Sequence, residues 1–382
     1  LYIEQVADET LTIQYVDTTP VTSTFDPADR GFSVTTTEVG QFRYITATDS
    51  MKLPDRIEIP TSSAFIDSLT VENALAAGKI DISVVDENSD ADTTGDLIIG
   101  RIEAGGASTP GGQRALELHA AWSIYDLFTD TAAPIVNITT TDPDGDVYLE
   151  AGEDIGRNGN FIDVTIAGEL TGTLGDDAFI HSVGDLYVGG TPLATANPRS
   201  FFESEDGNVT LDVDGTAHIG LIRAQGDGST DSASELTDGV VKIDAEDLIV
   251  DRRDDTEANI IATGAILNAG VDGGIGDVGT DGNPFETQVS RLEADVIGGG
   301  IWLENDGHMQ IGNISSQLGV RADETVDISV AGDLTINELV ESEDSSAATY
   351  VSLDATGDIV VNAGIISNSA DVTLDAGQDV LF

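Results

Sequence analysis

The sequence of 382 residues contains no cysteine, which excludes two kinds of stabilisation. Neither a disulfide framework nor a cysteine-ligated metal site can form. Aromatic residues are also scarce, at 5% of the chain against 40% hydrophobic residues in all. The predicted core therefore consists mainly of Val, Ile, Leu and Ala side chains.

Positive charge is scarce as well. The chain has 15 Lys and Arg residues against 70 Asp and Glu residues, a formal net charge of −55. Such a chain cannot neutralise phosphates, so nucleic acid and anionic membrane surfaces are excluded as partners. Charges of one sign repel one another and need screening by salt or bound cations. The composition therefore predicts a solvated acidic surface in a saline or cation-rich setting, and the sharper alternative is stoichiometric Ca²⁺ binding.

What the sequence does contain is a repeat, clearest in the last sixty residues. The segments 326–336, 351–361 and 372–382 each have an alternating apolar and polar run, a Gly, usually a nearby Asp, and a second alternating run. Their central glycines, Gly332, Gly357 and Gly377, are 25 and 20 residues apart. Alternation with a period of two predicts β-strands rather than helices.

Looser copies of this pattern precede the clear ones, with central positions that are 16 to 31 residues apart. We take these positions as Gly152, Gly168, Gly184, Gly215, Glu246 and Gly264. A propeller or sandwich would keep a tighter period, whereas a solenoid accepts loops on a constant two-strand core. We therefore predict an all-β fold, a parallel β-solenoid with irregular loop insertions near residues 106–114, 189–206, 224–238 and 268–290.

The predicted domain organisation has two parts. Residues 1–65 form an irregular β-rich N-terminal region, which is a cap, a small β-domain or a set of divergent coils, and residues 66–382 carry the β-helix repeats. No run of 18 apolar residues occurs, so no transmembrane helix is predicted. The chain starts at Leu1 without a visible secretion signal, and its last repeat reaches Phe382 with the alternation intact. We expect a processed product or an internal piece of a longer protein, in which further coils or another subunit continue the stack.

Two segments carry a more specific resemblance. Residues 276–294 and 298–312 are similar to a connector that recurs in very large bacterial surface proteins. The repeats over residues 70–382 resemble those of filamentous-haemagglutinin-like exoproteins and autotransporter passengers. The resemblance implies a right-handed parallel β-helix, and a secreted adhesin or structural fibre outside the cell or on its surface. The secretion domain typical of two-partner exoproteins is not recognisable in this chain.

The candidate metal site is an acidic turn. Asp142, Asp144, Asp146 and Glu150 offer several carboxylates, the oxygen ligands that Ca²⁺ prefers. The turn is not an EF-hand, because Val147 stands where that loop requires Gly. The alternative is an acidic turn without an ion.

No catalytic set is predicted. The four histidines are scattered without i,i+4 pairing and are expected to be ordinary coil residues: His119, His181, His218 and His308. The only adjacent basic pair, Arg252 and Arg253, lies among aspartates that neutralise it. Asn137, Asn208 and Asn313 fit the N-glycosylation pattern, as expected by chance in a Thr-rich chain.

We therefore predict a non-enzymatic structural or adhesive protein, with no cofactor other than Ca²⁺. Its partners are adjoining repeats or copies joined end to end, cell-surface glycans or other surface proteins. Two alternatives stay open, a polysaccharide-degrading β-helix enzyme and a surface-layer or matrix protein held by Ca²⁺.

Overall fold

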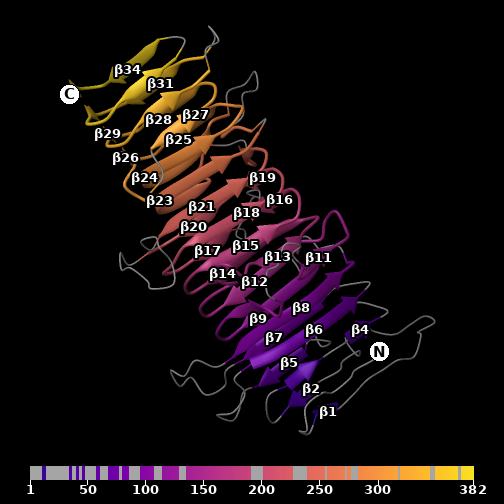
Figure 1. Cartoon of the computed structure of the whole chain (residues 1–382). Helices are drawn as coiled ribbons and strands as arrows, with labels where there is room; N and C mark the ends of the chain where they lie inside the picture. Colours follow the sequence, from indigo (N-terminus) through magenta and orange to yellow (C-terminus); the bar gives the residue numbers. More distant parts are fainter. Residues whose placement is uncertain are drawn as a thin grey trace. The chain divides into compact units, whose positions relative to one another are not determined.

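The computed structural model describes the strands within residues 11–85, and then residues 95–106, 114–128, 135–190, 201–226, 239–253, 256–271, 273–276, 283–316, 319–344, 349–368 and 371–382. Over these residues the chain is all-β and has no helix (Figure 1). This part of the chain therefore offers no helix long and apolar enough to cross a membrane. The chain divides into two units, Leu1–His181 and Ser182–Phe382.

The first unit consists of short strands rich in Val, Ile, Leu and Thr, residues that favour extended backbone. They are β1 (Leu11–Ile13), β2 (Val34–Thr36), β3 (Gly40–Phe42), β4 (Ile45–Ala47), β5 (Ile57–Pro60), β6 (Ser68–Ala76), β7 (Ile80–Val85), β8 (Asp96–Ala104), β9 (Leu116–Ala120), β10 (Ile124–Asp126), β11 (Ile138–Thr140), β12 (Val147–Ala151), β13 (Ile162–Thr165), β14 (Glu169–Leu174) and β15 (Ala178–Ser182). The last residue of β15, Ser182, is the first residue of the second unit.

In the described part of the first unit the strands pair mainly in parallel, and the antiparallel contacts are the pair β1 and β2 and an isolated bridge between Arg157 and Asn160. Strands β3 and β4 pair with β6, and β5 pairs with β7. Parallel pairing thus begins at Gly40, before the boundary expected at residue 66. One continuous column runs from β7 through β9 and β12 to β14.

The second unit has the same kind of strands. They are β16 (Leu186–Val188), β17 (Phe202–Ser204), β18 (Val209–Val213), β19 (Ala217–Ile219), β20 (Ile222–Ala224), β21 (Val240–Ala245), β22 (Ile249–Asp251), β23 (Ile260–Ala269), β24 (Phe285–Val296), β25 (Ile301–Asn305), β26 (Met309–Ile311), β27 (Val320–Ala322), β28 (Val326–Val330), β29 (Leu334–Ile336), β30 (Val340–Ser342), β31 (Val351–Ala355), β32 (Ile359–Val361), β33 (Ile365–Ser367), β34 (Val372–Ala376) and β35 (Val380–Leu381).

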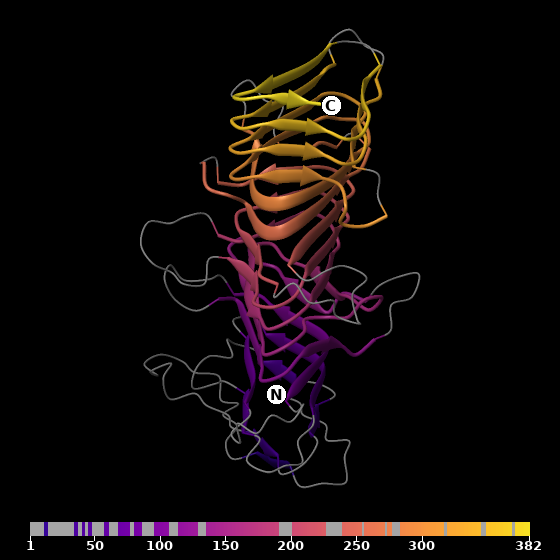
Figure 2. The same ribbon diagram turned by 90° about the vertical axis from the view of Figure 1, so that its left-hand side faces the viewer.

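Towards the C-terminus these strands form three columns of parallel pairs (Figure 2). One column is β25, β28, β31 and β34, the second is β26, β29, β32 and β35, and the third is β27, β30 and β33. The predicted all-β architecture with mainly parallel strands is confirmed, whereas the solenoid form and its handedness stay predictions. The repeat contains a third strand that the two-strand pattern did not predict.

Register fixes which residues face inward. Val326 pairs with Val351, and Ile328 with Leu353, so each apolar residue lies against an equivalent apolar residue of the next strand. All four of these side chains are fully buried. Alternate residues of the same strands point outward and are polar, as a period of two requires. The interior is a set of aliphatic columns, with few large aromatic side chains such as Phe202 and Phe285.

Two sequence expectations are wrong in detail. The loop expected at residues 189–206 includes β17, and the one expected at 268–290 includes the end of β23 and the start of β24. The 16-residue steps from Gly152 to Gly168 and Gly184 are not coil repeats, because Gly152 lies against Gly175 and Gly168 against Gly145. Register partners are instead from 18 residues apart, for Phe285 and Leu303, to 38 apart, for Ile222 and Ile260. Most of the other two expected loops lies outside the described residues.

Candidate functional site

The acidic turn that was predicted to bind Ca²⁺ is a compact hydrogen-bonded turn in the first unit. The Asp142 carboxylate accepts a hydrogen bond from the backbone N–H of Asp144 at 3.0 Å. The Asp142 carbonyl accepts another from Gly145 at 2.8 Å. This is the usual local role of Asp at the start of a turn.

The other two predicted ligands make contacts elsewhere. Asp146 Oδ1 accepts from the backbone N–H of Glu169 at 3.0 Å, and its Oδ2 lies 3.6 Å from Arg114 Nη1. Glu150 lies on β12 and contacts His119 on β9. Within the described residues, no three His, Asp or Glu side chains are grouped so that they could hold a metal ion. Binding of Ca²⁺ at this turn stays a prediction.

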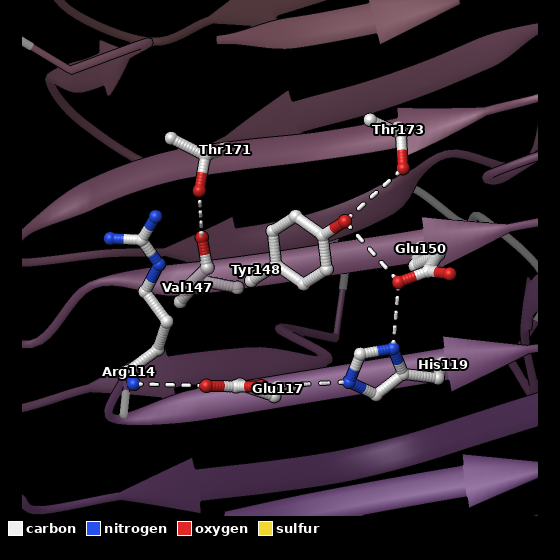
Figure 3. A network of polar contacts seen from close by, with 8 residues as sticks. All are labelled: Arg114, Glu117, His119, Val147, Tyr148, Glu150, Thr171 and Thr173. Atoms are coloured by element: carbon white, nitrogen blue, oxygen red, sulfur yellow. Dashed lines mark hydrogen bonds and ion pairs between the residues drawn. The ribbon is translucent and has the colours of Figure 1, made fainter. Parts of the chain in front are cut away.

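The contact of Glu150 belongs to a polar cluster on the outward face of β9, β12 and β14 (Figure 3). His119 Nδ1 lies 3.0 Å from Glu150 Oε2, and His119 Nε2 lies 3.6 Å from Glu117 Oε2. The Tyr148 hydroxyl lies 3.2 Å from both Glu150 Oε2 and Thr173 Oγ1. The register brings these groups together, because His119 pairs with Glu150, and Glu150 with Thr173.

This geometry ties strands together more readily than it performs acid–base chemistry. Both ring nitrogens of His119 face carboxylates, and its side chain is only 16% exposed. A general base needs a nitrogen that can approach a substrate proton. The Tyr148 ring packs beside the imidazole, with ring centroids 5.7 Å apart. The cluster therefore serves as a cross-strand contact in the first unit.

The other histidines also have neighbours that sequence spacing did not indicate. His181 Nδ1 lies 2.6 Å from Asp163 Oδ1, and that carboxylate belongs to a residue 1% exposed. His308 Nδ1 accepts from the backbone N–H of Asp333 at 2.9 Å. The expectation of ordinary coil residues missed these contacts because the partners are 18 and 25 residues away in the chain.

His218 stacks on an aromatic ring in the second unit. Its ring centroid is 4.2 Å from that of Tyr187, with the planes 4° apart, and the Arg252 guanidinium lies 5.1 Å from the same tyrosine ring. Burial lowers the pKa of His218, the nearby Arg252 adds to the effect, and the Asp185 carboxylate opposes it.

An aspartate ladder links successive repeats near the C-terminus. Asp333 Oδ1 accepts from the backbone N–H of Asp358 at 2.8 Å, and Asp358 Oδ1 accepts from that of Asp379 at 3.0 Å. The same contact occurs from Asp185 to Thr216 in the second unit and from Asp146 to Glu169 in the first. The Asp beside the central Gly was visible in the sequence. That its carboxylate accepts a backbone N–H of the next repeat becomes evident only from the register.

Two buried asparagines form matching corners, one in each unit. Asn137 Nδ2 donates to the carbonyls of residues 99 and 100 and to Asp126 Oδ1, and its Oδ1 accepts from Asp163 N–H at 2.8 Å. Asn259 Nδ2 donates to the carbonyls of residues 219 and 220 and to Asp251 Oδ1, and its Oδ1 accepts from Glu286 N–H at 3.0 Å. Asp163 and Glu286 therefore occupy equivalent positions.

These contacts also bear on the glycosylation motifs. Asn137 is 0% exposed and Asn208 is 1% exposed. A sugar cannot be attached to a side chain inside the folded interior, so in both cases the motif is a chance match. Asn313 is exposed and has a positive φ of 65°.

Comparison with protein-family models, with curated proteins and with solved structures finds no match to this chain.

Proposed function

We propose that this chain is a non-enzymatic β-solenoid that forms a structural or adhesive segment of a secreted bacterial surface protein or filament. The observation that carries the proposal is the register of the last coils, in which β28, β31 and β34 pair in parallel with equivalent residues opposite each other. A coil that presents the same apolar row and the same Asp to its neighbour can be repeated without a new core. The resemblance of the repeats to filamentous-haemagglutinin-like exoproteins supports a right-handed β-helix and an extracellular location.

The polar clusters support the absence of catalysis. In the described residues, the His119 and His181 imidazoles are placed against carboxylates, and Asp146 is placed against Arg114. Such pairs link neighbouring strands on the outer face. On this account, function depends on a stiff stack and on the surface that its loops and outward side chains present to glycans, other surface proteins or further copies.

Electron microscopy of the native material in negative stain tests this proposal. We expect fibres, or long extensions from the cell surface, that antibodies against the purified chain decorate. Short isolated particles in the culture medium, without fibres, would contradict it.

The second candidate is the polysaccharide-degrading enzyme. If the chain is such an enzyme, the group to test first for proton transfer is His119, which lies between Glu117 and Glu150. An activity screen on acidic polysaccharides decides between them. Turnover that is lost in a His119→Gln variant would establish the enzyme.

A further inference from the structure

The second unit has two aromatic side chains on the outward face of the adjacent strands β25, β28 and β31. Trp302 lies on β25, where its register partner on β28 is Asp327. Tyr350 lies directly before β31. Gly300, Thr325 and Tyr350 each precede a residue of one register column, so they form the neighbouring row. The two aromatic residues are therefore in adjacent rows and two strands apart, a distance of roughly 9.6 Å at the usual strand spacing.

The indole of Trp302 lies along the sheet. Gly300 is two residues before Trp302 and has no side chain. A Cβ atom at Gly300 would overlap Cη2 of the indole and would lie 2.7 Å from its Cζ3. The six-membered part of the ring therefore leans back over Gly300 instead of pointing away from the strand. One face of this partly exposed indole rests against the backbone, and the opposite face is turned outward.

The phenol of Tyr350 lies along the same face. Its hydroxyl donates to Asp327 Oδ2 on the neighbouring strand at 3.0 Å, which requires the ring to run across the strands. The side chain is nevertheless 38% exposed. Thr325 lies between the two aromatic residues and is only 6% exposed, although alternation turns it outward, as expected beneath two rings that lie flat.

Hydrogen-bond acceptors surround the two rings. In the described part of the chain, the hydrogen bond of the Asp327 carboxylate is the one from Tyr350 to Oδ2, so Oδ1 is available to a ligand. Glu304, Ser352 and Asp354 occupy further outward positions on β25 and β31. The sequences of β25, β28 and β31 contain no Lys or Arg. This face therefore suits a ligand that donates hydrogen bonds and has no negative charge.

An uncharged sugar has the chemistry that such a face recognises. The face of an aromatic ring is the negative side of its quadrupole, and the C–H groups on the flat side of a pyranose are weakly positive. The sugar hydroxyls donate charge-assisted hydrogen bonds to carboxylates at the ring edge. A protein partner is less well matched, because a specific interface needs roughly 800 Å² on each side. Here two rings lie among polar side chains.

We propose that Trp302 and Tyr350 bind an extended, uncharged β-1,4-linked oligosaccharide of glucose-type units. One sugar unit packs on each ring, and the unit between them passes over Thr325. Every second unit of such a chain presents the same face, as two rings on one side of a sheet require. Asp327 accepts a hydrogen bond from a hydroxyl of the bound sugar. The site rests on the proposed function, because it names the glycan class for the adhesive surface.

Isothermal titration calorimetry of the full chain with cellohexaose tests the proposal. Maltohexaose is the comparison, because it has the same composition and α-linkages that curve the chain. We expect saturable binding of cellohexaose and at least about tenfold weaker binding of maltohexaose. Trp302→Ala and Tyr350→Ala should each weaken cellohexaose binding at least about tenfold, because a stacking surface is lost. Asp327→Asn should weaken it about fivefold, since a neutral acceptor replaces a charged one.

Trp122→Ala is the matched control, because Trp122 is the other tryptophan of the chain, is also partly exposed and lies in the first unit. Its replacement should leave binding unchanged, and circular dichroism should show the variants folded. Asp327→Asn keeps the shape of the side chain and serves as the test if an aromatic variant does not fold.

Three results would overturn the site: no saturable binding of cellohexaose, equal binding by Trp302→Ala or by Asp327→Asn, or an equal loss in Trp122→Ala. The outcome is separate from that of electron microscopy. Fibres from a chain that does not bind cellohexaose would overturn this site and leave the proposed function in place. Cellohexaose binding by short isolated particles would support the site and contradict the filament.

Discussion

Removing the buried asparagine of a corner should destabilise its unit by about 3 kcal/mol. In Asn259→Ala the backbone N–H of Glu286 loses its acceptor in a fully buried environment, which costs roughly 1–3 kcal/mol. The other groups lose less. The Ile219 carbonyl still accepts from Arg252 N–H at 3.0 Å, and Asp251 Oδ1 still accepts from Arg253 N–H at 2.8 Å. The lost donor bonds add roughly 0.5–1.5 kcal/mol each.

The first unit supplies an independent repeat of the experiment. Asn137→Ala removes the same set of hydrogen bonds. The Ile99 carbonyl still accepts from Leu127 N–H, and Asp126 Oδ1 still accepts from Phe128 N–H. The two variants should therefore cost similar amounts. Asn362→Ala is the control, because that side chain is exposed and makes one hydrogen bond to Asn337, so the change should be within about 0.5 kcal/mol.

The assay uses the two tryptophans of the chain, Trp122 in the first unit and Trp302 in the second. Repeat arrays unfold in parts, so one global transition is not assumed. Urea unfolding followed by fluorescence, in Trp122→Phe and Trp302→Phe backgrounds, reports each unit separately. A cost below about 1 kcal/mol in both asparagine variants would refute the reasoning, since buried groups would then tolerate the loss of their partner.

Two further predictions concern the outer face of the second unit. In Gly357→Ala the new methyl group would overlap Asp333 Oδ1, the acceptor of the ladder bond to Asp358. Urea unfolding should therefore show a loss of roughly 1–3 kcal/mol in the free energy of unfolding. The control is Gly364→Ala, whose methyl group would lie 3.4 Å from Leu339 Cδ1 and which should be nearly neutral. Equal effects of the two substitutions would contradict the ladder. Because burial lowers the pKa of His218, the folded form binds its proton less readily than the unfolded form, whose pKa is about 6.5. The stability of the second unit should therefore be full above that pH and should fall as the pH drops below it. The fall should be larger in the wild type than in His218→Gln. An identical pH dependence in the two proteins would count against the buried stack on Tyr187.

The strands of the clear repeats were predictable from the sequence because they alternate with a period of two. Val326, Ile328 and Leu353 could be placed in the interior on that pattern alone, and they are fully buried. The third strand of each repeat was not predicted, because a segment such as Val340–Ser342 is too short to display a period. In the third copy of the repeat, the sequence pattern placed the central position at Gly377, one residue before Gln378, which is the residue that lies against Gly357. Gln378 donates its N–H to the Gly357 carbonyl, whereas Gly377 donates to Ala355.

The side-chain clusters depend on register, which sequence spacing does not reveal when loop lengths vary. His119 and Glu150 are 31 residues apart, and Asn259 and Glu286 are 27 apart. Nothing local distinguishes these residues from the many other polar residues of an acidic, Thr-rich chain. Asp142 was recognised as a turn residue, but a turn of this composition forms its own hydrogen bonds whether or not an ion binds.

The central claim, parallel stacking of the repeats in register, can be measured with introduced cysteines, because the chain has none of its own. Ser352 and Thr373 are register partners on β31 and β34. Their Cα atoms should be about 4.8 Å apart, within the range of roughly 4.4–6.8 Å that a disulfide spans.

The control pair is Ser352→Cys with Asp375→Cys. Asp375 is two residues further along β34, so the Cα separation rises to roughly 8 Å and exceeds the limit of about 7 Å for a disulfide. Mild oxidation followed by peptide mass spectrometry should give the disulfide in Ser352→Cys/Thr373→Cys and not in the control. Cross-linking of the control pair alone, or of both pairs equally, would contradict in-register parallel stacking.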